Sequence, residues 1–369
     1  MGNYPEPINL EHLNVYSLQN RKHKSRIQDI LIEPSASPQN CGDFVRQQIE
    51  GCAEKIKKAK EQKRSIILMY GAHLIKNGGQ LLVNHLVDKG FITHLATNGA
   101  GTIHDWEFSY IGCSTEDVRE NVASGSFGSW DETGRYIMIA LLSGGVRGDG
   151  YGKSLGQLIH EDGTSLLPIE ELIKTVADNP YDRLNGARMD LVYAMDKFNI
   201  KPGHNIVTHP YKNISVLGHS YLHKVPITVH PGIGYDIITN HPMYNGAVVG
   251  RAATIDFRLI CRAIDNLDNG VVLCIGSAIM APQVFEKAMS CVNNLRIKNF
   301  RPIVSGHTIY VVDIQDGGKW DWTTGEPPKD DPAYYLRFCK SFSRMGGAMH
   351  YVQSDNIQFL HNLYHNLVK

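Results

Sequence analysis

Short, almost wholly apolar runs alternate with longer amphipathic stretches along most of the chain. Five of the apolar runs are six or seven residues long and rich in β-branched residues, as strands are. They span residues 65–70, 91–97, 225–230, 271–276 and 308–314. Strands that are apolar on both faces are typical of a parallel sheet covered by helices on either side.

Between these runs, apolar residues recur at the spacing of an α-helix. In the first helical stretch, Val45, Ile49, Ala53 and Ile56 fall on one face. The helical stretches span residues 44–63, 74–89, 170–177, 183–198, 254–267, 283–295 and 333–342. This alternation predicts a doubly wound, Rossmann-like α/β fold with a mostly parallel sheet and helices on both faces.

Two segments depart from the rhythm. Residues 1–42 contain a basic stretch and a turn-rich stretch without sustained periodicity, so we predict an N-terminal arm that precedes a single α/β domain over residues 43–369. Residues 143–167 are rich in glycine and predict a long loop, a kind of loop that is usually functional or disordered.

The composition is that of an ordinary soluble enzyme. The 369 residues include 37 basic and 37 acidic side chains, so no net charge draws the chain toward nucleic acid or a membrane. No apolar run approaches the length of a membrane span, and the first residues lack the apolar core of a signal peptide. Seven scattered cysteines without a CxxC pair indicate reduced thiols. We expect a cytoplasmic protein whose partners are small molecules and its own subunits.

Glycine-rich turns follow the first two predicted strands. Thr97–Gly101 reads TNGAG, in which Gly99 and Gly101 can adopt positive φ and direct backbone N–H groups toward a phosphate. The alternative is a tight connection without a ligand, since the spacing is not that of a GxGxxG fingerprint. His73, His104 and Asp105 lie just beyond these turns, where side chains enter the crevice of an open α/β sheet.

Other predicted strands end in polar or small residues as well. Asp236 could bind a substrate ammonium or a ribose hydroxyl, or act only as a turn or cap residue. Gly276 and Ser277 would approach a ligand from the next strand end. Asp313 and Asp316 could hold a cation or bind ribose hydroxyls, and a simple turn is the alternative.

Two further patterns resemble binding motifs only in part. Residues 148–154 (GDGYGKS) approach a phosphate-binding GxxxxGK[ST] loop, but Arg147 stands where its first glycine belongs, so we interpret this segment as a mobile loop near the cofactor. His219 and His223 have the i, i+4 spacing of zinc ligands, to which Asp236 could add a carboxylate. Without an HExxH motif, polar loop histidines are the alternative, and we assign no metal ligand.

At these residues the chain resembles the deoxyhypusine synthase family and its uncharacterised bacterial relatives, over most of residues 65–345. The motifs that carry the resemblance are YGAHLIKNGG, THLATNGAGTIHDWEFSYIGCSTEDV, GSFGSWDETG, VHPGIGYDI, VLCIGSAI and VVDIQDGG. The resemblance implies a Rossmann-like sheet that binds NAD, in a homotetramer with sites between subunits. Synthases of this family oxidise spermidine with NAD and pass an aminobutyl group through a lysine to a protein lysine.

The resemblance extends to individual residues. It implies that Lys340, eight positions after Pro332, is the active-site lysine, with Phe338 at the position of the family's tryptophan. A lysine buried beside an aromatic ring can lose its proton and act as a nucleophile, whereas an exposed helical lysine is the alternative. The predicted cofactor-binding residues are Thr97, Asn98, Gly99, Ala100, Gly101, Asp105, Asp236, Gly276, Ser277, Asp313 and Asp316.

The chain also departs from the family pattern. Met280, Ala281 and Pro282 replace its consecutive histidines, Tyr334 replaces a carboxylate before the lysine, and Ile103 and His104 replace glutamates of the cofactor turn. We therefore do not expect deoxyhypusine formation itself.

The function predicted from the sequence is that of an NAD-binding enzyme acting on a small amine or amino-acid-like substrate. Hydride transfer would form an imine, with His73 or His104 as proton acceptor and Lys340 trapping the imine or positioning the substrate. The alternatives are a metal-dependent hydrolase that uses the histidine-rich residues 204–241, and a non-catalytic protein that senses a nucleotide.

Overall fold

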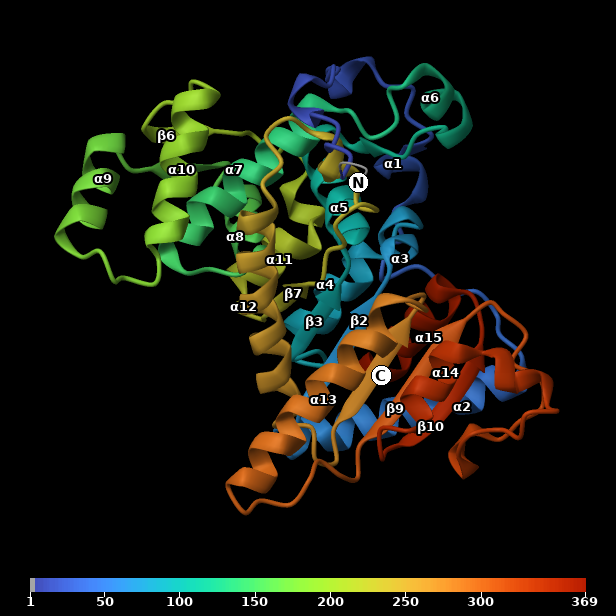
Figure 1. The fold of residues 1–369 in the computed structure, drawn as a ribbon. Coiled ribbons are helices and arrows are strands. Elements are labelled where there is room, and N and C mark those ends of the chain that lie inside the picture. Colours follow the sequence, from blue (N-terminus) through green and yellow to red (C-terminus); the bar gives the residue numbers. More distant parts are fainter. Residues whose placement is uncertain (1–3) are drawn as a thin grey trace.

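A six-stranded parallel sheet forms the centre of the computed structural model, which describes residues 4–369 (Figure 1). Its strands are β2 (Ile66–Tyr70), β3 (His94–Thr97), β7 (Ile227–Val229), β8 (Val271–Ile275), β9 (Thr308–Asp313) and β10 (Ala348–Gln353). Their order across the sheet is β7-β3-β2-β8-β9-β10, and every neighbouring pair is parallel. Numbered along the chain within this sheet, the order is 3-2-1-4-5-6, that of dinucleotide-binding sheets. The strand order reverses between β2 and β8.

The sheet has a hydrophobic core on each face, as the apolar runs predicted. Ile66, Leu68 and Tyr70 of β2 belong to one core and Ile67 and Met69 to the other, because alternate side chains of a strand point to opposite faces. Helices on the first face include α2 (Asp43–Glu61), α4 (Gln80–Asp88) and α15 (Asn356–Val368). The second face is covered by the end of α12 (Gly246–Ile264) with α13 (Met280–Lys298) and α14 (Arg337–Ser343). The fold is therefore the predicted doubly wound α/β fold.

A long, mostly helical insertion separates β3 from β7. It contains α5 (Gly99–Ile111), β4 (Cys113–Ser114), α6 (Val118–Ser124), α7 (Asp131–Arg147), α8 (Tyr151–His160), α9 (Ile169–Asp178), α10 (Asn185–Lys197) and α11 (Val216–Leu222). An antiparallel pair, β5 (Gly163–Leu166) and β6 (Gly203–Ile206), lies between these helices. Figure 1 shows α9, α10 and β6 beside the sheet, on the side of β7.

The prediction of a long loop over residues 143–167 was wrong. The end of α7, all of α8 and strand β5 occupy this segment. Its glycines allow close packing: a Cβ on Gly152 would lie 1.9 Å from the Ile227 carbonyl oxygen, and one on Gly156 would lie 2.5 Å from that of Leu217. Glycine clusters therefore mark tight contacts of α8 in this segment, and the residues that resemble a phosphate loop form its first turn.

Element boundaries differ from the predictions mainly where glycine or proline intervenes. The helix predicted over residues 74–89 divides into α3 (Ala72–Lys76) and α4 at Gly78, which has a φ of +83°. The helix predicted over residues 333–342 begins as a 3₁₀ turn, Pro332–Tyr335, before α14. Strand β10 was not predicted, because at the edge of the sheet it keeps exposed Ala348 and Gln353 and lacks a continuous apolar run.

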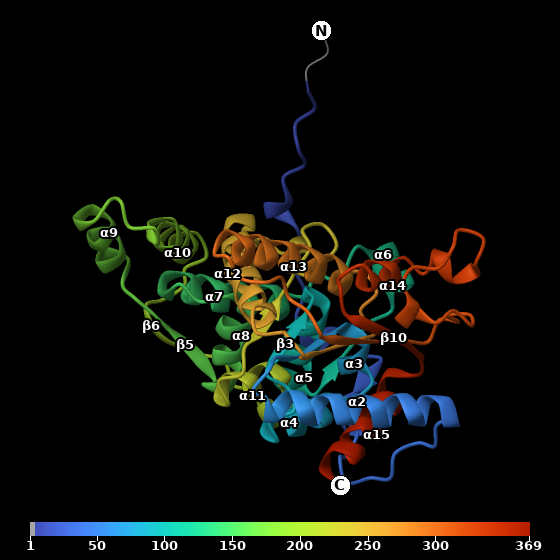
Figure 2. The same cartoon turned by 90° about the horizontal axis from the view of Figure 1, so that it is seen from below.

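The described part of the N-terminal segment, from residue 4 onward, first projects from the body, as Figure 2 shows, and packs against it further along. It contains two short 3₁₀ turns, Leu10–His12 and Leu18–Asn20, the short strand β1 (Ser25–Arg26) and α1 (Ile27–Ile30). Leu18 is fully buried, and β1 pairs antiparallel with β4, which follows α5. This part of the segment therefore supports the end of α5. Among the described helices, none has the length and apolar character that a membrane span requires.

Candidate active site

Most of the predicted site residues lie at the carboxyl edge of the sheet, where parallel strands all end on one side. His73 follows β2, the TNGAG turn follows β3, Asp236 follows β7, and Gly276 follows β8. Asp313 is the last residue of β9. In folds of this kind, ligands bind outside this edge at the point where the strand order reverses.

The two loops at the reversal point touch through glycine. A Cβ added to Gly71, directly after β2, would lie 2.2 Å from the carbonyl oxygen of Gly276, and the backbone N–H of Gly71 donates to the Ile275 oxygen. Gly276 itself has a φ of +59°, a conformation that glycine adopts without strain. The two loops therefore pack directly against each other, and the Asn356 side chain fills the space beside Gly276, where a Cβ would lie 2.3 Å from its Nδ2.

At the start of α5, the Asp236 carboxylate occupies the space beside Gly99 that a larger side chain would fill. Gly99 and Gly101 do not have the positive φ expected of them; both belong to the first helical turn. A Cβ on Gly99 would lie 2.1 Å from Asp236 Oδ2, and one on Gly101 would lie 2.2 Å from Thr97 Oγ1. The Asn98 side chain caps the helix by accepting from the Gly101 N–H. Because Asp236 already brings negative charge here, this turn suits a hydroxyl or an ammonium better than a phosphate.

Asp236 is a buried carboxylate without a cationic partner. It is 3% exposed; its Oδ2 accepts from the Gly232 N–H at 2.8 Å, and its Oδ1 has no hydrogen-bond partner among the described residues. Burial raises the pKa of Asp236 to about 6. Tyr244 is half-buried with a buried hydroxyl oxygen, and its pKa is raised by burial and by the Asp236 charge. A carboxylate oxygen without a donor can accept from an N–H or O–H group of a ligand where its side chain borders a cavity.

A chain of hydrogen bonds orients His104 on α5. Its Nδ1 lies 2.6 Å from Ser114 Oγ, which donates to Glu107 Oε2 at 2.6 Å. Glu107 also accepts hydrogen bonds from both terminal guanidinium nitrogens of Arg21, at 2.9 and 2.6 Å. Burial acts to raise the Glu107 pKa, but Arg21 outweighs burial and the pKa is lowered, so the carboxylate is ionised. The Ser114 proton is therefore donated to Glu107.

It follows that Nδ1 of His104 carries the imidazole proton and that Nε2 presents a lone pair. Burial lowers the pKa of His104 to about 4 against the opposing charge of Glu107, so the ring is neutral at pH 7. The basic side chains of Lys76, Arg21 and His73 contribute smaller effects in the same direction as burial.

His104 and Asp236 line the same cavity of about 260 Å³. Ala100 and Ile103 of α5 form part of its wall, and its charged lining also includes Lys76, Arg21, Glu107 and Glu116. Arg21 is held by Glu107, whereas Lys76 has no ion-pair partner among the described residues. The volume is at the lower limit of small-molecule sites, which suits a compact substrate. A carboxylate and an unpaired ammonium in one cavity match the two charges of an amino acid.

Asp105 was expected to bind the cofactor but instead caps α11. Its carboxylate accepts from Ser215 Oγ at 2.7 Å and from the backbone N–H groups of Val216 and Leu217, both at 3.0 Å. Burial raises the Asp105 pKa to about 6 despite these bonds. The carboxylate thus fixes α11 to α5, which leaves it engaged within the protein.

The predicted residues near β9 and α14 are not brought together with this cavity. Asp313 accepts from the Gln315 N–H and Asp316 from the Gly318 N–H, both as local turn bonds. Lys340 lies 3.4 Å from the centre of the Tyr334 ring and 3.8 Å from Glu326, and both partners attract a cation. Its own hollow, of about 370 Å³, shares no lining residue with the first cavity. A larger hollow of about 680 Å³ beside Gly317 and Gly318 contains no predicted site residue.

The histidines of residues 204–241 lie on several elements and do not form one cluster. His204 is exposed on β6, and His241 contacts Asp131 at 3.2 Å. Only His219 and His223 converge on a carboxylate, that of Asp88. The suggestion that Asp236 would join them was wrong, because Asp236 lies against Gly99.

Several important residues escaped the sequence analysis. Glu107 and Ser114 orient His104, and Arg21 belongs to a basic stretch that suggested only an arm. Glu107 gave one available signal, because it is an acidic residue three positions after His104 within an otherwise apolar helix. Asp88 ends a helix distant in sequence from the histidines, so only the packing of α4 against α11 identifies it.

Comparisons with known proteins give no family. No protein-family model and no curated protein matches the chain. Solved structures that share its general arrangement include the apo form of ArgZ, a cyanobacterial arginine dihydrolase (16% identity, TM-score 0.41), covering 87% of this chain and 32% of ArgZ. Another is the ternary complex of AgrE with ornithine and NAD⁺ (13% identity, TM-score 0.44), covering 89% of this chain and 34% of AgrE.

A conserved putative LOR/SDH protein from Methanococcus maripaludis S2 is similar at 14% identity and a TM-score of 0.40, over 92% of this chain and 73% of that protein. The chain spans about a third of the length of ArgZ and AgrE. None of these three is described as a deoxyhypusine synthase. Likeness at this level carries no argument about activity, which has to come from the site itself.

Proposed function

We propose that this protein is an NAD-binding enzyme that oxidises a small amine or amino-acid-like substrate. The observation that carries the proposal is the cavity in which the unpartnered Oδ1 of Asp236 and the proton-accepting His104 meet, at the carboxyl edge of a 3-2-1-4-5-6 sheet. The deoxyhypusine synthase resemblance supports the same cofactor, while its departures argue for a different substrate.

The residues present suit a dinucleotide in a particular orientation. Gly71 and Gly276 let the loops after β2 and β8 approach each other closely at the strand-order reversal, the point where dinucleotides bind in sheets of this order. The Asp236 carboxylate at the start of α5 is unsuited to phosphate and suited to hydroxyl or ammonium donors. At the strand-order reversal, the loops after β2 and β8 would hold the pyrophosphate of NAD, and Asp236 would accept from a hydroxyl or ammonium group.

When bound, NAD supplies the acceptor for a hydride from the carbon that bears the amine. Asp236 holds the substrate ammonium through its free oxygen, and Lys76 attracts a substrate carboxylate. The ammonium nitrogen gives up one proton to Nε2 of His104 as the hydride leaves, so an iminium forms and charge balances. The His104 pKa of about 4 means that this proton passes on to solvent without being retained.

The proposed reaction does not use Lys340, whose ammonium lies against the Tyr334 ring and 3.8 Å from Glu326, in a hollow that shares no lining residue with the cavity. Transfer of an aminobutyl group through this lysine is accordingly not proposed.

The test combines cofactor binding with turnover. Purified protein is titrated with NAD⁺ by calorimetry and then screened with spermidine, ornithine, arginine and lysine while absorbance at 340 nm is followed. The expected result is NAD⁺ binding and a rise in absorbance with at least one substrate that carries an ammonium group. His104→Gln should lower kcat about 100-fold or more with little change in NAD⁺ affinity, while the exposed His204→Gln serves as the matched control.

Failure of NAD⁺ to bind or to raise the melting temperature would contradict the proposal outright. Binding without any change at 340 nm across the substrate panel would favour the alternative of a nucleotide sensor. The metal-dependent hydrolase is not retained, because the histidines that converge do so away from the cavity.

A further inference from the structure

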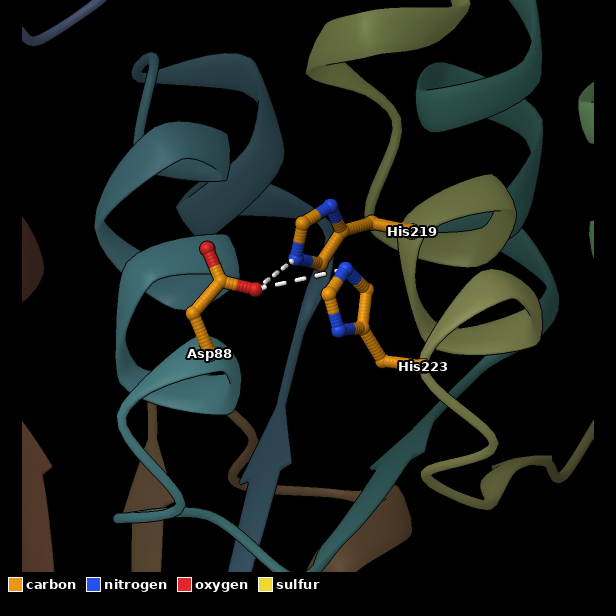
Figure 3. Close-up of side chains that lie close together, drawn as sticks. All are labelled: Asp88, His219 and His223. Atoms are coloured by element: carbon orange, nitrogen blue, oxygen red, sulfur yellow. Dashed lines mark hydrogen bonds and ion pairs between the residues drawn. The ribbon is translucent and has the colours of Figure 1, made fainter.

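Asp88, His219 and His223 converge at the contact between α4 and α11, as Figure 3 shows. Asp88 is the last residue of α4, His219 lies in the last turn of α11, and His223 is its C-cap. The i, i+4 spacing places both imidazoles on one side of the helix, where the rings stack with centroids 4.3 Å apart. Both Nε2 atoms face the same oxygen, Asp88 Oδ1, at 2.7 and 3.4 Å.

We infer that Asp88, His219 and His223 form a binding site for zinc or a similar first-row divalent metal ion. One nitrogen or oxygen from each residue lies within 4.8 Å of the others. In a tetrahedral site with metal–ligand distances of about 2.1 Å, neighbouring ligand atoms are about 3.4 Å apart. The Asp88–His223 separation of 3.4 Å already has this value, and the shorter Asp88–His219 separation is that of a hydrogen bond. A metal ion that replaces the proton between His219 and Asp88 requires these two side chains to move apart only slightly.

The surroundings favour a cation. Both α4 and α11 end at the site, and the carboxyl end of a helix carries a partial negative charge. Asp88 and His223 are exposed enough for an ion to reach them and for water to occupy a fourth position.

The site is distinct from the candidate active site. Asp88 precedes β3 by six residues and His223 precedes β7 by four, so the cluster is near the amino edge of the sheet. His104 and Asp236 follow the carboxyl ends of the same two strands. The expected role of the metal is structural, because it joins a helix of the main sheet to a helix of the long insertion.

The experiment is a Zn²⁺ titration of the full chain against a chromophoric chelator, with Co²⁺ absorption as a report of coordination. The wild-type protein should bind one Zn²⁺ per chain, melt at a higher temperature when it is bound, and give the visible bands of a four- or five-coordinate Co²⁺ site with nitrogen ligands. His223→Gln and Asp88→Asn should each weaken binding at least about 10-fold and remove the bands. His204→Gln and Asp178→Asn, both at exposed positions, are the matched controls and should bind like the wild type.

Two results would overturn the inference. One is a wild-type protein that does not compete with the chelator for Zn²⁺ and shows no Co²⁺ bands. The other is equal affinity in wild type, His223→Gln and Asp88→Asn, which would place any bound metal elsewhere. Circular dichroism of each variant confirms that it is folded, and the two variants test the site independently. Neither result bears on NAD⁺ binding, so this inference and the proposed function fail separately.

Discussion

Two helices of this protein begin with the same local arrangement, and only one of them opens onto a cavity. At Gly99 the carboxylate of Asp236 occupies the space of a missing Cβ, and at Gly150, the N-cap of α8, the carboxylate of Asp256 does the same at 1.8 Å. Asp256 is fully buried, and its Oδ2 accepts from the N–H groups of Gly152 and Val229 at 3.0 and 2.8 Å. It therefore holds α8 against β7.

Both carboxylates have an Oδ1 without a hydrogen-bond partner among the described residues, but only Asp236 lines a cavity, the one that His104 also lines. The comparison shows that a glycine before a helix can accommodate a carboxylate for two different reasons. One carboxylate stabilises a junction between elements, and the other is available to a ligand. Access to a cavity distinguishes them, and the sequence around each glycine does not.

The largest expected effect is a pH dependence of the free energy of unfolding that arises from Asp256. Burial raises the Asp256 pKa to about 7, above its unfolded value near 3.8, so the native state favours the protonated form. The resulting stability is complete below about pH 4 and is lost as pH rises through 7, by roughly 4 kcal/mol in total. Asp256→Asn, which imitates the protonated acid, should remove most of this slope in urea unfolding measured from pH 4 to 8. Parallel curves for the two proteins would show that Asp256 titrates normally.

Alanine at the two glycines should give opposite outcomes. Gly150→Ala should cost about 3 kcal/mol in free energy of unfolding, because Asp256 is held from several sides and cannot move away. Gly99→Ala should cost less stability and impair substrate binding, because Asp236 can turn toward the cavity. Gly250→Ala in α12, where a Cβ would meet nothing within 4 Å, is the control and should be neutral or slightly stabilising. Equal losses of stability in Gly150→Ala and Gly99→Ala would contradict the assignment of Asp256 to structure and Asp236 to ligand binding.

Asp236→Asn should affect binding where Asp256→Asn affects stability. Loss of the charge-assisted bond to a substrate ammonium is expected to raise KM by about 10- to 100-fold. Since the Asp236 pKa is about 6, wild-type KM should also rise as pH falls below 6, and the variant should lack that dependence. Steady-state kinetics of wild type, Asp236→Asn and the exposed Asp178→Asn provide the measurement. An unchanged KM in Asp236→Asn would assign the carboxylate to structure alone.

The smallest effect concerns the orientation of His104. Ser114→Ala removes the acceptor of the Nδ1 proton and should lower kcat about 10-fold, with KM nearly constant. Ser124→Ala, at an exposed position, is the control. If Ser114→Ala instead changed KM alone, the hydrogen-bond chain would have a role in binding and none in proton transfer.

Five of the six sheet strands and the doubly wound layering could be predicted from the sequence, because strands buried on both faces leave continuous apolar runs. The site was predicted less completely. His104 and Asp236 are found from their positions after strands, since topology alone brings parallel strand ends together. The hydrogen-bond chain through Ser114, Glu107 and Arg21 depends on how the N-terminal segment packs beside α5, which no local pattern encodes. The misread glycines of residues 143–167 have the same origin, because flexibility and close packing both select glycine.

The cap that Asp105 provides for α11 joins the proposed metal site to the candidate active site through two packed helices, α11 and α5. Asp105 is next to His104 on α5, and the helix that it caps carries His219 at its other end. Helix α11 thus connects the Asp88, His219 and His223 cluster near one edge of the sheet with α5, whose His104 lines the cavity at the other edge. Thermodynamic linkage then imposes reciprocity: whatever factor a bound metal ion contributes to substrate affinity, the substrate must contribute to the affinity for the metal.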